Sequence, residues 1–194
     1  MKKLLVSLFT VFILALAFSA QSASAAYKYP NGKAAQVGDI LVTSDGALWG
    51  LVGHTAIVSS PNQIMEITGK GDHPTNKSIS NWFKKKNRPT KVVRINNKHK
   101  AELAGYWAHM YNPKATYGFV NGMNFELYNT EKTYCSKIVY QAYSIGSGVF
   151  PTAELVAKQD AITPYFFLYK GNWPSKYNPK LVYSNGMKGT GTIK

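Results

Sequence analysis

Cys135 and His54 are the residues whose types and positions could supply a nucleophile and its base. Cys135 is the only cysteine of the chain and lies in the stretch TEKTYCSKIVYQAYSIG, Thr130 to Gly146. A single thiol cannot close an internal disulfide. It is therefore a reactive group, an intermolecular link or a small buried hydrophobe. Its place in the expected helix favours the first of these.

The helix around Cys135 is expected to begin just before the thiol. Residues at helical spacing share one face that packs on a sheet, namely Cys135, Ile138, Val139 and Ala142. Thr133 is expected as the N-cap, and Gly146 as the residue after the C-terminal cap. In the first turn the helix dipole favours a thiolate, and unpaired backbone N–H groups can receive an oxyanion. A nucleophile gains from both effects, whereas a structural cysteine gains from neither.

His54 is the histidine best placed to act as the base. It opens an apolar strand directly after WGLVG, where a polar side chain has no evident packing role. The other three, His73, His99 and His109, stand in a polar loop or on a helix, where surface solvation suits them. A nucleophilic cysteine needs a base of this kind, held in place by a third group.

Glu66 is the candidate for that third group through strand parity. In a hairpin joining residues 54–59 to 63–68, directly opposed positions sum to a constant. An odd-length loop such as Ser60 to Asn62 makes that sum even, so that His54 and Glu66 share a face. An odd sum places Glu66 on the other face, where it is an exposed strand carboxylate.

The elements that must position these residues mix helices and strands without a βαβ rhythm, which indicates the α+β class. Strands are expected at 37–43, 54–60, 63–68 and 91–95, and helices at 79–86, 97–111 and around Cys135. The second helix carries a stripe of large apolar residues expected to face the core, Leu103, Tyr106, Trp107 and Met110. Residues 69–76 and 112–133 are expected as loops, 163–173 as an aromatic strand or packed loop, and the Gly-rich tail as mobile or at an edge.

The N-terminus predicts export. Two lysines precede an apolar run from Leu4 to Ala20 and the small residues Ala23-Ser24-Ala25, so residues 1–25 are expected to be a cleaved signal peptide. An uncleaved membrane anchor is the alternative, since no charge lies between Lys3 and Lys28. Residues 26–194 are then expected to form one domain that is secreted and associated with the cell wall, without stable membrane insertion.

The charge of the chain predicts anionic partners. The net charge is +14, of which Lys2 and Lys3 carry two units, so the chain from Ala26 keeps +12. Outside a cell such a surface meets anionic wall polymers and lipids, and the export signal argues against nucleic acid.

The ordered motifs GDILVT, GHTAIV, MEITG and TYCSKIVYQAY resemble the circularly permuted papain-like cysteine amidases and peptidases of the NlpC type, the YiiX-like group. The resemblance runs from about Val37 to Pro164. It implies a papain-like fold in which an antiparallel sheet packs against the nucleophile-bearing helix and a second long helix. It also implies Cys135 as nucleophile with its backbone N–H in the oxyanion hole, His54 as general base and acid, and Glu66 as the group that orients His54. Asp39 is expected to be structural, and neither a cofactor nor a metal is expected.

The resemblance implies hydrolysis of an amide bond through a thioester, with the stem peptides of peptidoglycan as the leading substrate. The alternatives are a lipid acyl hydrolase or acyltransferase of the same fold, and a non-catalytic module that binds the cell wall. Tyr134, Trp107 and Tyr117 are candidates to line the substrate groove. An acyl pocket could draw on further aromatic residues, Trp82, Phe119, Phe125, Tyr165, Phe166 and Phe167, which are otherwise core. The oligomeric state is left open.

Overall fold

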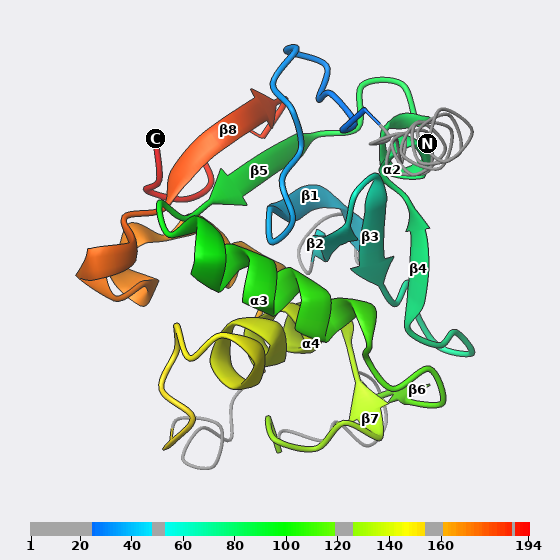
Figure 1. Ribbon diagram of the computed structural model, residues 1–194. Coiled ribbons are helices and arrows are strands. Elements are labelled where there is room, and N and C mark those ends of the chain that lie inside the picture. The colour runs from blue at the N-terminus through cyan, green and yellow to red at the C-terminus, as the bar shows by residue number, and fades with distance from the viewer. Residues whose placement is uncertain (1–24, 48–52, 119–125, 154–160, 188) are drawn as a thin grey trace, which may run out of the picture.

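The fold is built on a six-stranded antiparallel sheet, seen in a computed structural model that describes residues 25–47, 53–118, 126–153, 161–187 and 189–194 (Figure 1). The strands follow the order β4-β3-β2-β1-β5-β8. Their bounds are β1 Ile40–Ala47, β2 Gly53–Ser60, β3 Gln63–Glu66, β4 Thr75–Ser78, β5 Thr90–Arg94 and β8 Lys180–Asn185. A separate parallel pair joins β6 (Thr116–Tyr117) to β7 (Lys132–Thr133).

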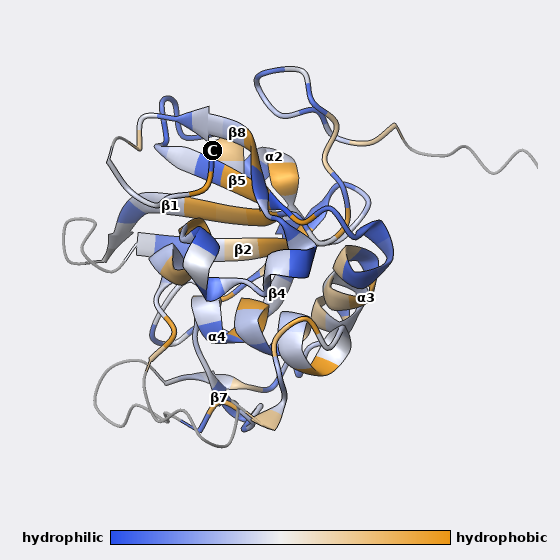
Figure 2. Ribbon diagram, turned by 90° about the vertical axis from the view of Figure 1, so that its left-hand side faces the viewer, coloured by the Kyte–Doolittle hydropathy of each residue, from blue (hydrophilic) through white to orange (hydrophobic). Residues whose placement is uncertain are grey.

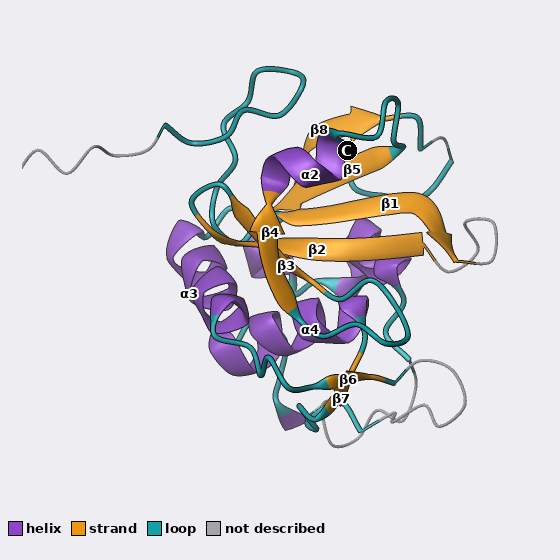
Figure 3. Cartoon of the chain, turned by 90° about the vertical axis from the view of Figure 1, so that its right-hand side faces the viewer, coloured by secondary structure: helices purple, strands orange, loops and turns teal. Residues whose placement is uncertain are grey.

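Helices and short helical turns surround this sheet (Figure 3). The α-helices are α2 (Ile79–Phe83), α3 (Lys98–His109) and α4 (Cys135–Gln141). The last continues as a π-helical turn, η2 (Ala142–Gly146), and three 3₁₀ turns follow, η3 (Pro164–Leu168), η4 (Lys170–Asn172) and η5 (Ser175–Tyr177). The α+β class is confirmed by this arrangement, whereas the likeness to papain stays an expectation from the sequence.

Both faces of the sheet are covered, and alternate residues of each strand supply the two cores (Figure 2). On one face Ile40 and Ile57 pack against α3 and α4. On the other face Leu41 and Val58 pack against α2 and the N-terminal lead-in, which contributes the buried ring of Tyr29. The sheet therefore separates two hydrophobic cores, and each candidate catalytic residue lies near one or both of them.

Helix α3 packs on the sheet through small residues, and of the four residues expected as a large apolar stripe only Trp107, which is half-buried, packs against the core. Its buried positions are Ala101, Ala104, Gly105 and Ala108. Leu103, Tyr106 and Met110 are exposed, Met110 by 80%. A Cβ atom on Gly105 would lie 2.6 Å from the carbonyl oxygen of Val58 and 2.8 Å from the backbone nitrogen of Gly38. Small residues occupy the contact between α3 and the sheet because the helix lies too close to the sheet for large side chains to fit.

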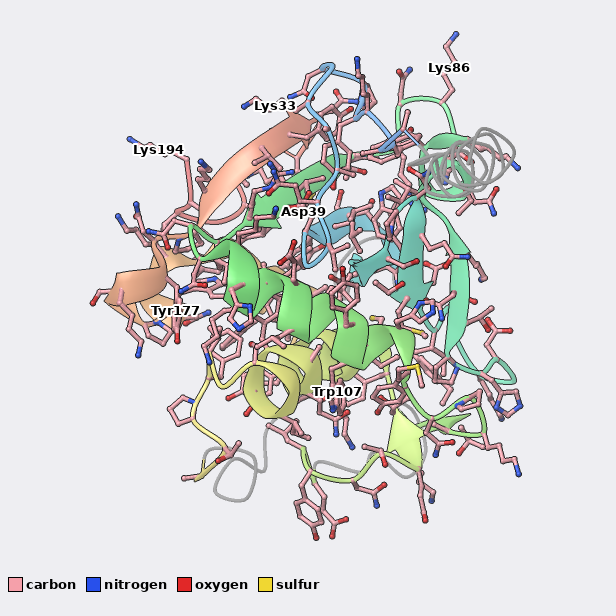
Figure 4. All side chains as sticks on the ribbon, in the orientation of Figure 1. Lys33, Asp39, Lys86, Trp107, Tyr177 and Lys194 are labelled. Carbon is pink, nitrogen blue, oxygen red and sulfur yellow. The ribbon has the colours of Figure 1, made fainter. Side chains whose placement is uncertain are left out.

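Asp39 is structural, as expected, since its carboxylate is the centre of a buried network (Figure 4). It accepts hydrogen bonds from Arg94 Nε at 2.7 Å and from the Tyr29 hydroxyl at 2.7 Å. The backbone N–H of Gln36 donates to the same group at 2.9 Å. These bonds fix the turn from which β1 enters the sheet.

Several other expected elements differ in the structure. Strand β4 begins at Thr75, at the end of the region expected as a loop, and the segment 163–173 forms the short 3₁₀ turns η3 and η4, not a strand. The first expected helix ends at Phe83. Strand β8 forms the sheet edge beside β5, and the tail after it folds back so that Thr192 and Ile193 donate backbone hydrogen bonds to Leu168. The end of the tail is thus packed beside the edge strand, where Leu181 of β8 donates a backbone hydrogen bond to Lys194, and of the two expectations the edge position fits.

The expected signal peptide falls almost wholly in residues 1–24, which lie outside the described residues. Within the ranges that the structure describes, no helix is long and apolar enough to cross a membrane.

Candidate active site

The sheet register brings His54 and Glu66 together. Ile57 pairs with Met65 and Val58 with Ile64, so opposed positions give an even sum, and His54 and Glu66 are diagonal neighbours on one face. His54 Nε2 lies 2.8 Å from Glu66 Oε2. Lys77, on the neighbouring strand β4, reaches the other carboxylate oxygen at 3.2 Å. Both members of the His54–Glu66 pair are buried, with less than a tenth of their surface exposed.

Cys135 opens α4 and approaches His54 from the helical side of the sheet. The thiol belongs to the core formed with α3 and α4, whereas Trp82, which packs on His54, belongs to the opposite core. His54 is the second residue of β2. It forms a side-chain hydrogen bond with Cys135, and the backbone N–H of Thr55 also donates to the sulfur.

The start of α4 is held differently from the expectation. Tyr134, not Thr133, is the N-cap, and it makes no side-chain capping bond. The Thr133 hydroxyl is instead 2.9 Å from the hydroxyl of Tyr111, which donates at 2.7 Å to Gln141 Oε1. Gly146 ends the π-helical turn and is not a residue after a C-terminal α-helical cap. Buried hydrogen bonds of Tyr111, in the segment after α3, to Thr133 of β7 and Gln141 of α4 therefore help to fix the helix that carries Cys135.

The charges of the three groups support each other. Burial lowers the pKa of His54, but the Cys135 thiolate and Glu66 outweigh it and raise that pKa to about 9. Burial raises the pKa of the Cys135 thiol, but the charge and hydrogen bond of His54 and the Thr55 N–H bring it below its usual value. Burial likewise raises the pKa of Glu66, and the bonds from His54 and Lys77 lower it overall. The geometry favours a thiolate–imidazolium pair backed by a carboxylate.

The pH window of this charged set follows from the directions of the shifts. The stability that protonated His54 contributes is complete below its usual pKa of 6.5 and is lost as the pH rises through about 9. The stability that ionised Glu66 contributes is present above its usual pKa of 4.5 and is lost as the pH falls through its lowered value. The charged set therefore persists across neutral pH.

Two of the three groove candidates lie close to the thiol. Strand pairing sets Tyr117 beside Thr133, two residues before Cys135. Burial and then the negative charge of Cys135 raise the pKa of Tyr117 to about 12. Tyr134 shows the same two causes, with a pKa of about 12, although a bond from the backbone N–H of Ile162 opposes them. Both phenols keep their protons at neutral pH and remain hydrogen-bond donors near the sulfur.

Trp107, the third groove candidate, lies elsewhere. Its ring packs against Gly146 of η2 and meets Tyr111 edge-on at a centroid distance of 5.4 Å. Figure 4 shows it where α3 runs alongside the segment formed by α4 and η2. Trp107 packs against the core that contains Cys135, but among the described residues no hydrogen bond or ring contact links it to Cys135 or His54. Phe119 and Phe125, of the wider aromatic set, lie outside the described residues.

Trp82 contacts His54, a contact that the sequence did not predict. From the sequence Trp82 was expected only as an aromatic residue of an acyl pocket or of the core. Its ring stacks on the imidazole at a centroid distance of 5.4 Å and an interplanar angle of 21°. The single signal in the sequence was its place in a short helix directly before the basic run KKKNRP. In the described part of the chain, no three or more His, Cys, Asp and Glu side chains are grouped as a metal ion would need.

Glu66→Gln tests whether the carboxylate supports the charged pair. Without its negative charge we expect the pKa of His54 to fall below about 9 and the apparent pKa of the Cys135 thiol to rise by about one unit. Alkylation of Cys135 with iodoacetamide below pH 7 should then slow about tenfold. The matched control is Glu102→Gln, whose carboxylate pairs only with Lys98, at 3.6 Å on the surface of α3. An unchanged alkylation profile in Glu66→Gln would show that the Glu66 carboxylate does not stabilise the charged Cys135–His54 pair.

The thiol lies at the start of a helix that packs on an antiparallel sheet, and it interacts with an imidazole backed by a carboxylate. Such an arrangement can support acyl transfer through a thioester. The chain belongs to the family whose model is described as "Lipoprotein N-acylation protein LnsA-like", and this model matches residues 1–184. The description of the family names acylation of lipoproteins, which is an acyl transfer. Association with the cell wall stays a prediction.

The chain is also similar to a protein of Bacillus thuringiensis described as "Uncharacterized 30.3 kDa protein". The two are 32% identical over 162 residues, which cover 78% of this chain and 58% of that protein. The chain thus spans less than two thirds of the length of this relative. No solved structure matches the chain.

Proposed function

We propose that this protein transfers a fatty acyl group from a lipid ester to an amine of a lipoprotein, through a thioester on Cys135. The proposal is carried by one observation, the His54–Glu66 pair at 2.8 Å with the thiol of Cys135 against the same imidazole. It is supported by membership of a family described by lipoprotein N-acylation.

In the first step the Cys135 thiolate attacks the carbonyl carbon of the lipid ester. The oxyanion that forms is close to the backbone N–H groups of the first turn of α4 and to the Tyr117 hydroxyl. The imidazolium of His54 donates its proton to the departing alkoxide as the carbon–oxygen bond breaks. The products are a lysolipid, an acyl thioester on Cys135 and a neutral His54.

In the second step a neutral amine attacks the thioester carbonyl. His54 accepts the proton of the amine as the carbon–nitrogen bond forms, and the Cys135 thiolate leaves. The product is an amide, and the thiolate–imidazolium pair is restored. Glu66 keeps the imidazole ring in place and favours its charged form in both steps. A buried site suits this sequence because water would otherwise compete with the amine for the thioester.

The expected hydrolysis of wall peptides uses the same groups with water as the acceptor, and it is the second candidate. The order of the motifs favours it, whereas the description of the family favours acyl transfer. The high positive charge suits either an anionic lipid surface or an anionic wall polymer. A purely wall-binding role is the weakest candidate, because it gives no reason for a buried thiolate–imidazolium pair.

The test supplies the purified full chain with vesicles containing phosphatidylethanolamine and phosphatidylglycerol and with a diacylated lipopeptide whose N-terminal amine is free. We expect mass spectrometry to show the lipopeptide gaining one acyl chain and the vesicles gaining lysolipid. An acyl adduct on Cys135 that hydroxylamine removes should appear when the lipopeptide is left out. Cys135→Ala should abolish both signals.

Other outcomes of this test choose between the candidates. Lysolipid and free fatty acid in place of an acylated lipopeptide would make the protein a lipid acyl hydrolase. Cleavage of purified muropeptides, with no acyl adduct on Cys135, would replace acyl transfer by wall-peptide hydrolysis. Acylation that persists in Cys135→Ala would remove the thioester from the mechanism.

A further inference from the structure

Trp82 is a third partner of the His54 ring, beside the thiol and the carboxylate. The indole is buried on the face of the sheet that carries α2, and its plane lies within 21° of the imidazole plane. Its Nε1–H donates to Thr90 Oγ1 at 3.1 Å, which fixes the indole in its own plane. The stacking partner of the imidazole is therefore itself held in place by the neighbouring strand β5.

Arg88 makes a second contact with the same indole. Its guanidinium carbon lies 4.2 Å from the centroid of the Trp82 ring, within the range of a cation–π contact. The guanidinium forms a loose ion pair with Asp45, whose carboxylate lies 3.6 Å from Arg88 Nε and 2.7 Å from Lys85 Nζ, and Arg88 Nη1 donates to the backbone carbonyl of Trp82 at 3.5 Å. Residues from β1, α2 and the loop after α2 thus form one continuous set that ends on His54.

The charged and titratable groups around His54 come from every element packed against it. Cys135 of α4 and Glu66 of β3 contact the ring directly, and Lys77 of β4 contacts Glu66. Tyr117 and Tyr134 lie in the field of the Cys135 sulfur. Arg88 interacts electrostatically with both Asp45 and Glu66.

Hydrogen bonds to Glu66 and Cys135 hold the edge of the imidazole and still permit a tilt of its plane about the line through the two bonds. A parallel aromatic ring at 5.4 Å removes it, because turning the imidazole out of plane would drive its edge into the indole. The face of an indole also attracts a cation, so the protonated imidazole gains more from the stack than the neutral one.

We propose that Trp82 is a positioning residue for His54: its indole fixes the plane of the imidazole and favours the protonated ring, and Arg88 with Asp45 holds the indole in place. This inference rests on the proposed function only in taking His54 and Cys135 as the reacting pair. It does not depend on which acyl group is transferred or on which acceptor receives it. Removing the indole face should lower kcat for acyl transfer with little change in KM, because Trp82 acts through His54.

The test is the pH profile of Cys135 alkylation in the full chain, whose only thiol reports on the pair alone. We expect Trp82→Leu to slow alkylation at pH 6 by about three- to tenfold, through loss of the protonated imidazole as partner of the thiolate. Trp82→Phe keeps an aromatic face and should recover most of that loss. The matched controls are Trp173→Leu and Trp173→Phe, since Trp173 is a buried tryptophan whose described ring contacts do not include His54.

A second pair of variants separates the support of the indole from general loss of stability. Arg88→Met removes the cation from the Trp82 ring and should shift the alkylation profile in the direction of Trp82→Leu, by about two- to threefold. Lys85→Met removes the other partner of Asp45 without touching the indole and should leave the profile unchanged. Thermal unfolding of every variant records the structural cost separately.

The results that overturn the inference are distinct from those that overturn the proposed function. Profiles of Trp82→Leu and Trp173→Leu that coincide would show that Trp82 only fills the core. A wild-type profile with an ordinary thiol pKa would remove the pair that Trp82 is proposed to position, and the inference with it. Shifted alkylation in Trp82→Leu together with no acyl transfer by the wild type would keep the inference and remove the proposed function.

Discussion

His54→Ala should lower acyl transfer by about 10³-fold or more and return the Cys135 thiol to an apparent pKa near its usual value. The reason is that one imidazole has two duties. As a cation it lowers the pKa of the buried thiol, and as an acid and base it moves the proton in both steps of transfer. Without it, burial raises the pKa of the thiol, and the hydrogen bonds from the Thr55 N–H and from Ser136 oppose that rise. Rates of transfer to a lipopeptide and of alkylation against pH measure the two duties separately.

The control for this prediction is His99→Ala, since His99 is exposed at the start of α3 and lies far along the chain from the pair. That variant should match the wild type in both assays. If His54→Ala kept the alkylation profile of the wild type while losing transfer, His54 would be a proton carrier only. If it lost neither, the constellation described above would have no catalytic meaning.

Gly105→Val should cost the fold about 3 kcal/mol or more of unfolding free energy. Any Cβ at this position of α3 would lie within 2.8 Å of the Gly38 backbone nitrogen and within 2.6 Å of the Val58 carbonyl oxygen. These two groups are joined by a backbone hydrogen bond of 2.8 Å where β1 enters the sheet. The helix must therefore move outward, and urea unfolding monitored by circular dichroism gives the loss of stability.

The matched control is Gly69→Ala, because a Cβ there meets nothing within 4 Å. Its unfolding free energy should stay within about 0.5 kcal/mol of the wild type. Gly105→Ala is the intermediate case, in which the improved helix propensity offsets part of the steric cost. A Gly105→Val protein as stable as the wild type would mean that α3 does not lie as close to the sheet as described.

The pairing of His54 with Glu66 could be predicted from the sequence because the alternation of side chains along a strand is a local rule. The hairpin needed only an even register to put His54 and Glu66 on one face, and the pairing of Ile57 with Met65 gives that register. The buried face of α4 was also predictable, since Cys135, Ile138 and Val139 recur at helical spacing and are all buried. Their catalytic roles remain proposals.

The residues of α3 that contact the sheet could not be predicted from hydrophobicity. The distance between the helix backbone and the sheet determines which side chains fit there. Apolar periodicity favoured Leu103, Tyr106 and Met110, but these residues are exposed, and small residues take the contact. That choice depends on how close the helix axis comes to the sheet, a tertiary quantity with no signature in a short window of sequence. The stack of Trp82 on His54 was hidden for the same reason, since it joins α2 to the far end of β2.

Strands β4 and β8 were missed because both are edge strands rich in polar residues. TNKS and KLVYSN show little of the apolar alternation that marks a half-buried strand. Their pairing is decided by the neighbours β3 and β5, which offer free backbone groups at the two edges of the central strands. Thr133 resembles an N-cap by type, but its hydroxyl finds a better buried partner in Tyr111.

His54 lies in β2 and Cys135 opens α4, 81 residues later in the chain, so the reactive pair cannot form before both elements have been made. A chain still emerging from a ribosome or an export channel carries a thiol of ordinary acidity, protonated and slow at neutral pH. Only when α4 closes on the finished sheet does the imidazole reach the sulfur and release its reactivity. The thiol then becomes a reactive thiolate only when folding is complete, and an incompletely folded chain carries an unreactive thiol.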